Sequence, residues 1–96
     1  MIIGKVIGSV VCTQKDQSLK GIKMLCIQPI HIISADTVGS PIVALDAIGA
    51  GVGEMVMIVG GSSARNADGF AKVAVDQSII AIVDTIEIEG INVFKK

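Results

Sequence analysis

The segment that most resembles a ligand-binding motif is a run of alternating glycines, Gly49-Ala50-Gly51-Val52-Gly53-Glu54. Glycine-rich loops bind phosphate when they follow the pattern G-x-G-x-x-G and open a helix, or when a lysine completes a Walker motif. This run has the spacing G-x-G-x-G, leads into an apolar stretch typical of a strand, and lacks that lysine. We therefore expect a structural turn whose glycines adopt positive φ or allow close backbone approach.

A second polar segment, Gly61-Ser62-Ser63-Ala64-Arg65, combines two hydroxyls with a cation. Ser62 or Ser63 can cap one short helical turn, and the N-terminus of such a turn could hold an anion. The alternative is a capped turn that directs Arg65 toward a carboxylate, which in an oligomer would belong to a neighbouring subunit. We favour this second arrangement and expect Asp46 or Glu54 to be the acceptor.

Titratable side chains are scattered along the chain rather than clustered. His31, the only histidine, has no serine or cysteine tied to it, and we expect it to face solvent in a loop. The carboxylates Asp46, Glu54, Asp76 and Asp84 have no spacing suited to acid–base catalysis. Asp84 shares an alternating face with isoleucines, so we expect it to be paired there in a structural role. The sequence thus predicts no catalytic residue, no metal site and no cofactor.

Two cysteines, Cys12 and Cys26, have neither C-x-x-C spacing nor a nearby histidine. We expect both to be reduced and packed as small hydrophobic side chains, which is typical of a cytosolic protein. The opening residues lack the basic region and long apolar stretch of a secretory signal. No apolar run approaches the ~20 residues of a membrane helix. We therefore expect a cytosolic chain.

The elements that position these residues follow a period of two. From Ile2 onward the even positions are small or apolar and the odd ones mixed, which predicts a half-buried strand with Gly4 and Gly8 on its inner face. An irregular connection is predicted over 31–40, and a short helical turn near Ser62. Further strands are predicted over 22–30, 41–48, 54–59 and 79–88, with room for a short terminal strand at 92–94.

Five main strands with glycine-rich corners predict an all-β fold, a small five-stranded OB-like β-barrel with one short helical turn. Alternation of strands with helices is absent, so a doubly wound parallel sheet is disfavoured. We expect residues 1–96 to form a single domain.

Composition narrows the choice of function. Apolar residues make up 51% of the chain, which is high for a domain too short to build covering helices, so we expect a subunit interface to cover the surplus. The net charge is −1, without a basic cluster, and the chain has two phenylalanines but no tyrosine or tryptophan. Binding of single-stranded nucleic acid relies on aromatic stacking, so nucleic acid is not an expected partner. A membrane surface is not expected either, because the chain has no basic cluster.

Several motifs form one ordered series along the chain: Gly4-Lys5-Val6-Ile7-Gly8-Ser9-Val10-Val11, Lys15-Asp16, Ser18-Leu19-Lys20-Gly21, Met24-Leu25, Gln28-Pro29, Val43-Ala44-Leu45-Asp46-Ala47-Ile48-Gly49-Ala50-Gly51-Val52-Gly53-Glu54, Val59, Gly61-Ser62-Ser63-Ala64-Arg65, Val75-Asp76 and Ile82-Val83-Asp84. In order and spacing this series resembles one known family, the bacterial microcompartment vertex proteins of the EutN/CcmL type. The resemblance extends over about residues 1–84. The residues after Asp84 are not diagnostic, and nothing is carried over for 31–39, where members of the family vary most.

The resemblance implies an OB-like barrel that forms a homopentamer, without enzymatic activity, at the vertices of a polyhedral shell. The implied partners are further copies of the chain and hexameric shell proteins, in a microcompartment within the bacterial cytoplasm. The residues expected at the interface or pore are Asp46, Gly49, Ala50, Gly51, Gly53, Glu54, Ser62, Ser63 and Arg65. The alternative is an OB-type module that binds single-stranded nucleic acid or a small ligand; a third interpretation is an enzyme that uses the glycine-rich turn.

Overall fold

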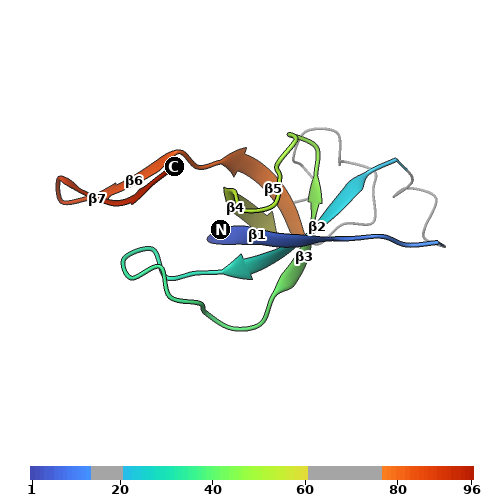
Figure 1. The fold of residues 1–96 in the computed structure, drawn as a ribbon, viewed down its shortest axis with the longest axis horizontal. Helices are drawn as coiled ribbons and strands as arrows, with labels where there is room; N and C mark the ends of the chain where they lie inside the picture. Colours follow the sequence, from blue (N-terminus) through green and yellow to red (C-terminus); the bar gives the residue numbers. More distant parts are fainter. Residues whose placement is uncertain (14–20, 61–76) are drawn as a thin grey trace.

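The computed structural model describes residues 1–13, 21–60 and 77–96, which form seven β-strands and no helix (Figure 1). The strands are β1 (Ile2–Val10), β2 (Lys23–Pro29), β3 (Ile42–Asp46), β4 (Met55–Gly60), β5 (Gln77–Ile82), β6 (Thr85–Ile88) and β7 (Ile91–Lys95). The all-β prediction is confirmed. The helical turn expected near Ser62 lies outside the described residues.

Five of these strands close into a barrel in the order β1-β2-β3-β5-β4. β1 pairs antiparallel with β2 on one side and with β4 on the other, and the parallel pairing of β3 with β5 completes the circle. The five-stranded barrel predicted from the sequence is therefore confirmed. The closing contact is short, since only Leu45 and Asp46 of β3 pair with Ser78 and Ile79 of β5.

The barrel interior is filled by aliphatic side chains that each strand directs inward. The buried cluster consists of Val6, Leu25, Ile27, Ala44, Ala50, Val56, Ile58 and Ile79. Burying one such Leu, Ile or Val side chain contributes about 1.5–3 kcal/mol relative to leaving it exposed. Ala50 comes from the glycine-rich segment after β3, so this segment is anchored in the core as well as lying on the surface.

The alternation predicted for β1 is seen from Gly4 to Val10, where each even position is more buried than its odd neighbours. Gly4 is buried, and a Cβ added there would lie 2.6 Å from Cγ2 of Ile27 and 2.9 Å from the carbonyl oxygen of Gln28. The pairing with β2 shifts register between Val6 and Gly8, and the position of a Cβ on Gly8 is open. The expected inner-face glycine is thus confirmed for Gly4 and wrong for Gly8, which is half-buried beside a bulge.

The single strand predicted over 79–88 is in fact two strands in different sheets, β5 and β6. The Val83 N–H donates to the carbonyl oxygen of Met55 at 2.7 Å, which holds the chain against the start of β4 before it leaves the barrel. Asp84 lies at this break with its side chain exposed. The expectation that Asp84 lies on an apolar face is therefore wrong, because the alternation that suggested it is interrupted at that residue.

β6 and β7 form a hairpin that pairs with no other strand among the described residues. Its two-residue turn, Glu89-Gly90, has positive φ at both positions, as in a type I′ hairpin. The terminal strand predicted at 92–94 is the second strand of this hairpin. Figure 1 shows the hairpin projecting from the end of the barrel where the N-terminus and the loop after β2 also lie. The molecule is accordingly elongated, with extents of 45, 23 and 22 Å.

The two glycines of β1 form a matched pair for testing this packing. Gly4→Ala should lower the free energy of unfolding by about 1–3 kcal/mol, because the new methyl meets backbone that cannot rotate away. Gly8→Ala should leave stability unchanged or raise it by up to about 1 kcal/mol, since the methyl enters open space. Urea denaturation of both variants at one protein concentration measures the difference. Equal stabilities would contradict the close approach at Gly4.

Candidate functional site

The glycine-rich segment after β3 is a turn whose shape is held by hydrogen bonds to a buried carboxylate. Asp46, the last residue of β3, accepts hydrogen bonds from the N–H groups of Ile48 at 3.1 Å and Ala50 at 2.9 Å. Lys23, its register partner on β2, donates to the carbonyl oxygen of Ala50 at 2.7 Å and lies 3.8 Å from the Asp46 carboxylate. The Asp46 side chain is 0% exposed, so its charge is satisfied within the chain.

The far side of the turn is closed by Glu54 and by β1. One carboxylate oxygen of Glu54 accepts the Gly51 N–H at 2.7 Å. The backbone of Val6 bonds to the turn twice, donating to the Glu54 carbonyl at 2.9 Å and accepting from the Gly53 N–H at 2.8 Å. With these bonds the N–H groups that a phosphate would need are largely used internally. The turn is therefore a rigid structural element rather than an anion cradle.

The glycines of the turn behave as predicted at two positions of three. Gly49 and Gly53 have φ of +87° and +92°, which a side chain would strain. Gly51 has no positive φ, and a Cβ there would only reach ordinary contact with Glu54 at 3.5 Å. Between the glycines, Ala50 is buried in the core and Val52 is exposed, and Ile48, just before Gly49, is a second exposed apolar side chain.

Glu54 also ties the root of the hairpin to the turn. Its second carboxylate oxygen accepts a hydrogen bond from Lys96 Nζ at 2.8 Å, and Lys96 Nζ lies 3.8 Å from the exposed Asp84. The bond from Lys96, together with the Gly51 N–H, lowers the pKa of the Glu54 carboxyl. The same bond raises the pKa of the Lys96 ammonium. The Lys96 N–H donates to the Asp84 carbonyl at 2.8 Å, which closes the hairpin at its base.

The structure thus brings together six of the nine residues expected at an interface or pore: Asp46, Gly49, Ala50, Gly51, Gly53 and Glu54. Ser62, Ser63 and Arg65 lie outside the described residues. Arg65 was expected to bind Asp46 or Glu54; of these two carboxylates, Asp46 is fully buried, whereas the Glu54 side chain retains 25% exposure beside Lys96.

The remaining candidates for chemistry are isolated in the described part of the chain. His31 is exposed in a loop, as predicted. Cys26 is half-buried and Cys12 is exposed, so the expectation of a packed side chain is wrong for Cys12; both thiols are free. Within residues 1–13, 21–60 and 77–96 no group of three metal-ligating side chains comes together, and no helix could cross a membrane.

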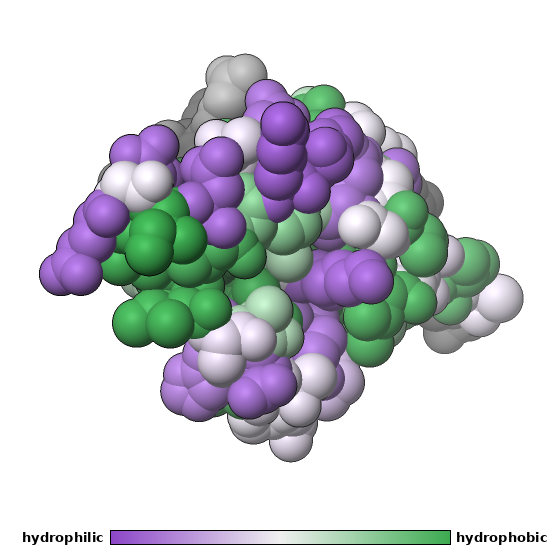
Figure 2. Space-filling model, turned by 60° about the vertical axis from the view of Figure 1, so that its left-hand side comes forward, coloured by the Kyte–Doolittle hydropathy of each residue, from purple (hydrophilic) through white to green (hydrophobic). Residues whose placement is uncertain are grey.

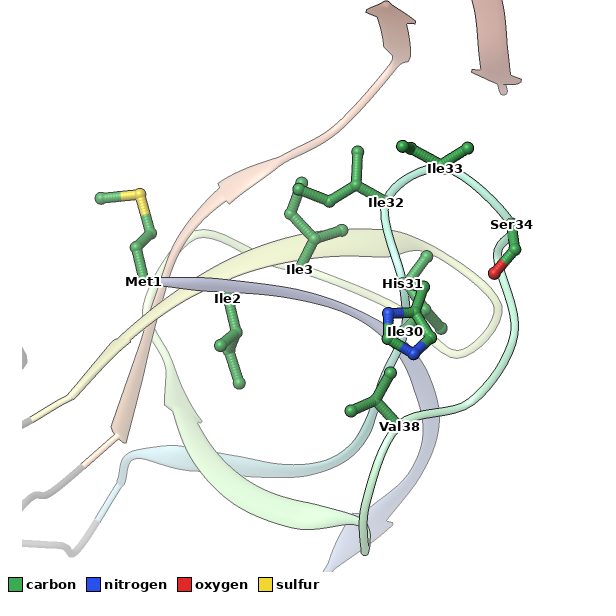
Figure 3. Close-up of a pocket in the computed structure, with 9 residues that line it drawn as sticks. All are labelled: Met1, Ile2, Ile3, Ile30, His31, Ile32, Ile33, Ser34 and Val38. Carbon is green, nitrogen blue, oxygen red and sulfur yellow. The ribbon is translucent and has the colours of Figure 1, made fainter.

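A feature that sequence reasoning missed is an apolar cleft at the N-terminal end of the barrel. Figure 3 shows its lining side chains, which come from the start of β1 and from the loop after β2. The cleft has a volume of about 480 Å³. It is lined by Met1, Ile2, Ile3, Ile30, His31, Ile32, Ile33, Ser34 and Val38. The adjacent isoleucines at 32 and 33, in a segment predicted to be an irregular loop, were the available signal. We call this feature the N-terminal cleft.

These features define a class of protein. The described residues form a small OB-type barrel whose most elaborate polar network fixes the shape of a surface turn. Twelve large apolar side chains are exposed among them. The class that this geometry defines is therefore a small OB-type barrel with a fixed glycine-rich turn and an apolar cleft.

The comparison with known proteins identifies the family. The family model described as ethanolamine utilisation protein EutN/carboxysome matches residues 1–84, and the chain belongs to this EutN/CcmL family. The bacterial microcompartment shell vertex protein GrpN of Rhodospirillum rubrum is 43% identical over 88 residues, which are 91% of this chain and 97% of GrpN. The match to the family model ends at Asp84, so the β6–β7 hairpin lies beyond the matched residues.

Solved structures of relatives share the fold. CcmL of a Nostoc species has a TM-score of 0.94 and 41% identity, with all of both chains covered. GrpN, solved as a pentameric microcompartment shell protein from Rhodospirillum rubrum, has a TM-score of 0.82 and 41% identity over 92% of this chain and 99% of its own.

The buried carboxylate yields a stability prediction. Asp46→Asn places an amide NH₂ where the turn needs a second acceptor, so one backbone N–H loses its acceptor and the other keeps only a neutral one. We expect the free energy of unfolding to fall by about 1.5–3 kcal/mol. Asp36→Asn, at an exposed aspartate in the loop after β2, is the control and should have no measurable effect. Similar urea midpoints for the two variants would show that Asp46 does not hold the turn.

The Glu54–Lys96 pair yields a pH prediction. Because the folded-state pKa of Glu54 is lowered, its contribution to stability is present above the unfolded pKa and is lost as pH falls through the folded one. Because the pKa of Lys96 is raised, its contribution is present below the unfolded pKa and is lost as pH rises through the folded one. The Glu54–Lys96 pair therefore stabilises the fold most at pH values above the unfolded pKa of Glu54 and below the unfolded pKa of Lys96.

An NMR titration of the Glu54 carboxyl measures this coupling directly. In Lys96→Met the pKa of Glu54 should rise, yet stay below its ordinary value because the Gly51 N–H remains. Lys95→Met removes a neighbouring exposed lysine and should leave the pKa of Glu54 where it is. A shift of equal size in both variants would mean that general charge, and not the 2.8 Å contact, lowers this pKa.

Proposed function

We propose that this chain is a structural shell protein that closes into a homopentamer and occupies the vertices of a bacterial microcompartment. The observation that carries the proposal is membership of the EutN/CcmL family together with likeness to GrpN, a pentameric shell protein, over 92% of the chain. The exposed apolar side chains of the protomer support it, because a ring would cover surface that a monomer leaves in water.

The work of such a pentamer is geometric. A layer tiled by six-fold units is flat, and five-fold units introduce the curvature that closes it into a polyhedron. The partners in this role are four further copies of the chain and hexameric shell proteins around each vertex. The shell would lie in the bacterial cytoplasm, and the chain would carry no enzymatic activity of its own.

We further propose that the ring interface or pore includes the glycine-rich turn, from Asp46 to Glu54, and the segment with Ser62, Ser63 and Arg65. The turn suits this role because its internal hydrogen bonds fix its shape before assembly, so little conformational entropy is lost on association. Glu54 is the partly exposed carboxylate that an arginine from an adjacent protomer could reach.

Native mass spectrometry tests the assembly. At micromolar concentration the protein should appear at five times the protomer mass of 9.9 kDa. Light scattering under the same conditions should give the same stoichiometry. A monomer throughout that range would overturn the proposed function.

Arg65 tests the polar part of the interface. Arg65→Ala should leave the barrel folded but shift the protein to monomers or partial rings, since loss of one partner of a buried charge pair costs about 2–5 kcal/mol. Arg65→Lys keeps the charge without the two-point geometry and should have an intermediate effect. Far-UV circular dichroism controls for folding. A pentamer that survives dilution in Arg65→Ala would show that apolar contacts alone hold the ring.

A further inference from the structure

Two exposed apolar surfaces of this protomer differ in form. One is the N-terminal cleft, and the other is the glycine-rich turn, which exposes Ile48 at its start and Val52 in its tight turn. We call the exposed side chains of Ile48 and Val52 the tip. Figure 2 brings the end with the cleft toward the viewer and shows apolar side chains gathered in patches on it. Apolar surface of this kind, left in water on a short chain, indicates a binding surface.

The cleft is lined mainly by apolar side chains, with the α-amino group of Met1 at its edge. Its outer wall is the loop after β2, where Ile33 is 73% exposed. Four backbone contacts hold this loop: a bridge between Ile30 and Thr37, the bond from His31 N–H to Asp36, the return bond from Ala35 N–H to His31, and the bond from Val38 N–H to Pro29. Apart from His31 the lining side chains carry no ionisable group. The cleft is thus preformed for an apolar occupant rather than for a charged ligand.

The tip has matching properties. Val52 is 69% exposed in a tight turn, and Ile48, four residues earlier in the same segment, is 42% exposed. The turn that presents them is fixed by Asp46 on one side and by Glu54 on the other. A small branched side chain on a rigid projection fits a cavity of about 480 Å³ better than a flat sheet face would.

The cleft and the tip of the glycine-rich turn do not contact each other within one protomer. Figure 1 places the turn between β3 and β4 on a different side of the barrel from the end that bears the N-terminus. A cyclic ring needs this arrangement, because each protomer contacts one neighbour with one surface and the other neighbour with a different one. The projecting β6–β7 hairpin beside the cleft adds to the argument, since a two-stranded sheet is marginal in water without a covering layer.

We propose that the N-terminal cleft of one protomer receives the tip formed by Ile48 and Val52 of the next protomer around the ring. This inference rests on the proposed pentamer and assigns to it a specific apolar contact. The occupant is a second copy of this chain because the chain itself carries the complementary surface, and because the pentameric relative shares the fold.

Charge substitutions test whether each surface is needed. Ile33→Asp in the cleft and Val52→Asp at the tip lie at exposed positions, so both proteins should fold normally by far-UV circular dichroism. Each should raise the protein concentration needed for half-assembly by on the order of a hundredfold, because an unpaired carboxylate would be buried in an apolar contact. Val11→Asp, at an apolar position that is 90% exposed beyond the other end of β1, is the control and should assemble like the wild type.

Cross-linking tests whether the two surfaces meet. In a Cys12→Ser background, the double substitution Ile33→Cys and Val52→Cys should, with a short bis-maleimide reagent, give covalent species up to the pentamer. Neither single cysteine variant should give this ladder, since each lacks one end of the contact. Peptide mapping should find position 33 of one chain joined to position 52 of another.

The outcomes separate this inference from the proposed function. If the wild type is a pentamer and Ile33→Asp remains one too, the proposed contact is wrong and the pentamer stands. The same conclusion follows if the double cysteine variant gives no ladder. Dissociation of Val11→Asp to the same extent would also overturn it, because the effect would then be unspecific. A wild-type monomer would overturn both the pentamer and the contact.

Discussion

The carboxylate of Asp46 is the interaction on which the surface geometry of this barrel depends. It is fully buried at the end of β3, and it is balanced by two backbone N–H groups of the turn and by Lys23 from β2. A buried charge without such partners would be strongly unfavourable, so the turn has to remain in the one conformation that supplies them. That conformation places Ala50 in the core and Val52 in solvent.

A second carboxylate extends this order from the barrel to the hairpin. Glu54 bonds to the turn through the Gly51 N–H and to the hairpin root through Lys96. The second contact is exposed and would be weakened by salt, whereas the contact of Asp46 is buried and would not. The barrel and turn therefore form one unit, and the hairpin is attached to that unit by the backbone bond from Val83 to Met55 and by one screened ion pair.

Sequence patterns predicted the barrel because its strands obey local rules. Period-two alternation and glycine-rich corners placed five strands, and the spacing of Gly49, Gly51 and Gly53 excluded a phosphate loop. The same rules failed where a long-range contact decides the outcome. The run around Asp84 reads as one alternating strand, yet Val83 bonds back to β4 and the chain leaves the barrel there. The cleft escaped detection because Met1–Ile3 and Ile32–Ile33 meet only after β1 and β2 have paired.

An assembling protomer needs polar contacts that fix its own shape and a surface that can contact a neighbour, and different side chains of this chain fill these two roles. The carboxylates of Asp46 and Glu54 are used inside the chain, where they fix the turn, while the N-terminal cleft and the exposed Val52 offer mainly apolar side chains. Apolar contacts are weakly directional, so on their own they would permit many relative orientations of two barrels. Direction then has to come from shape, and in the proposed contact the fixed turn of one protomer and the cleft of the next would supply it. The internal hydrogen bonds of Asp46 and Glu54 would then serve association by holding the turn in shape, without either carboxylate touching the neighbour at the cleft.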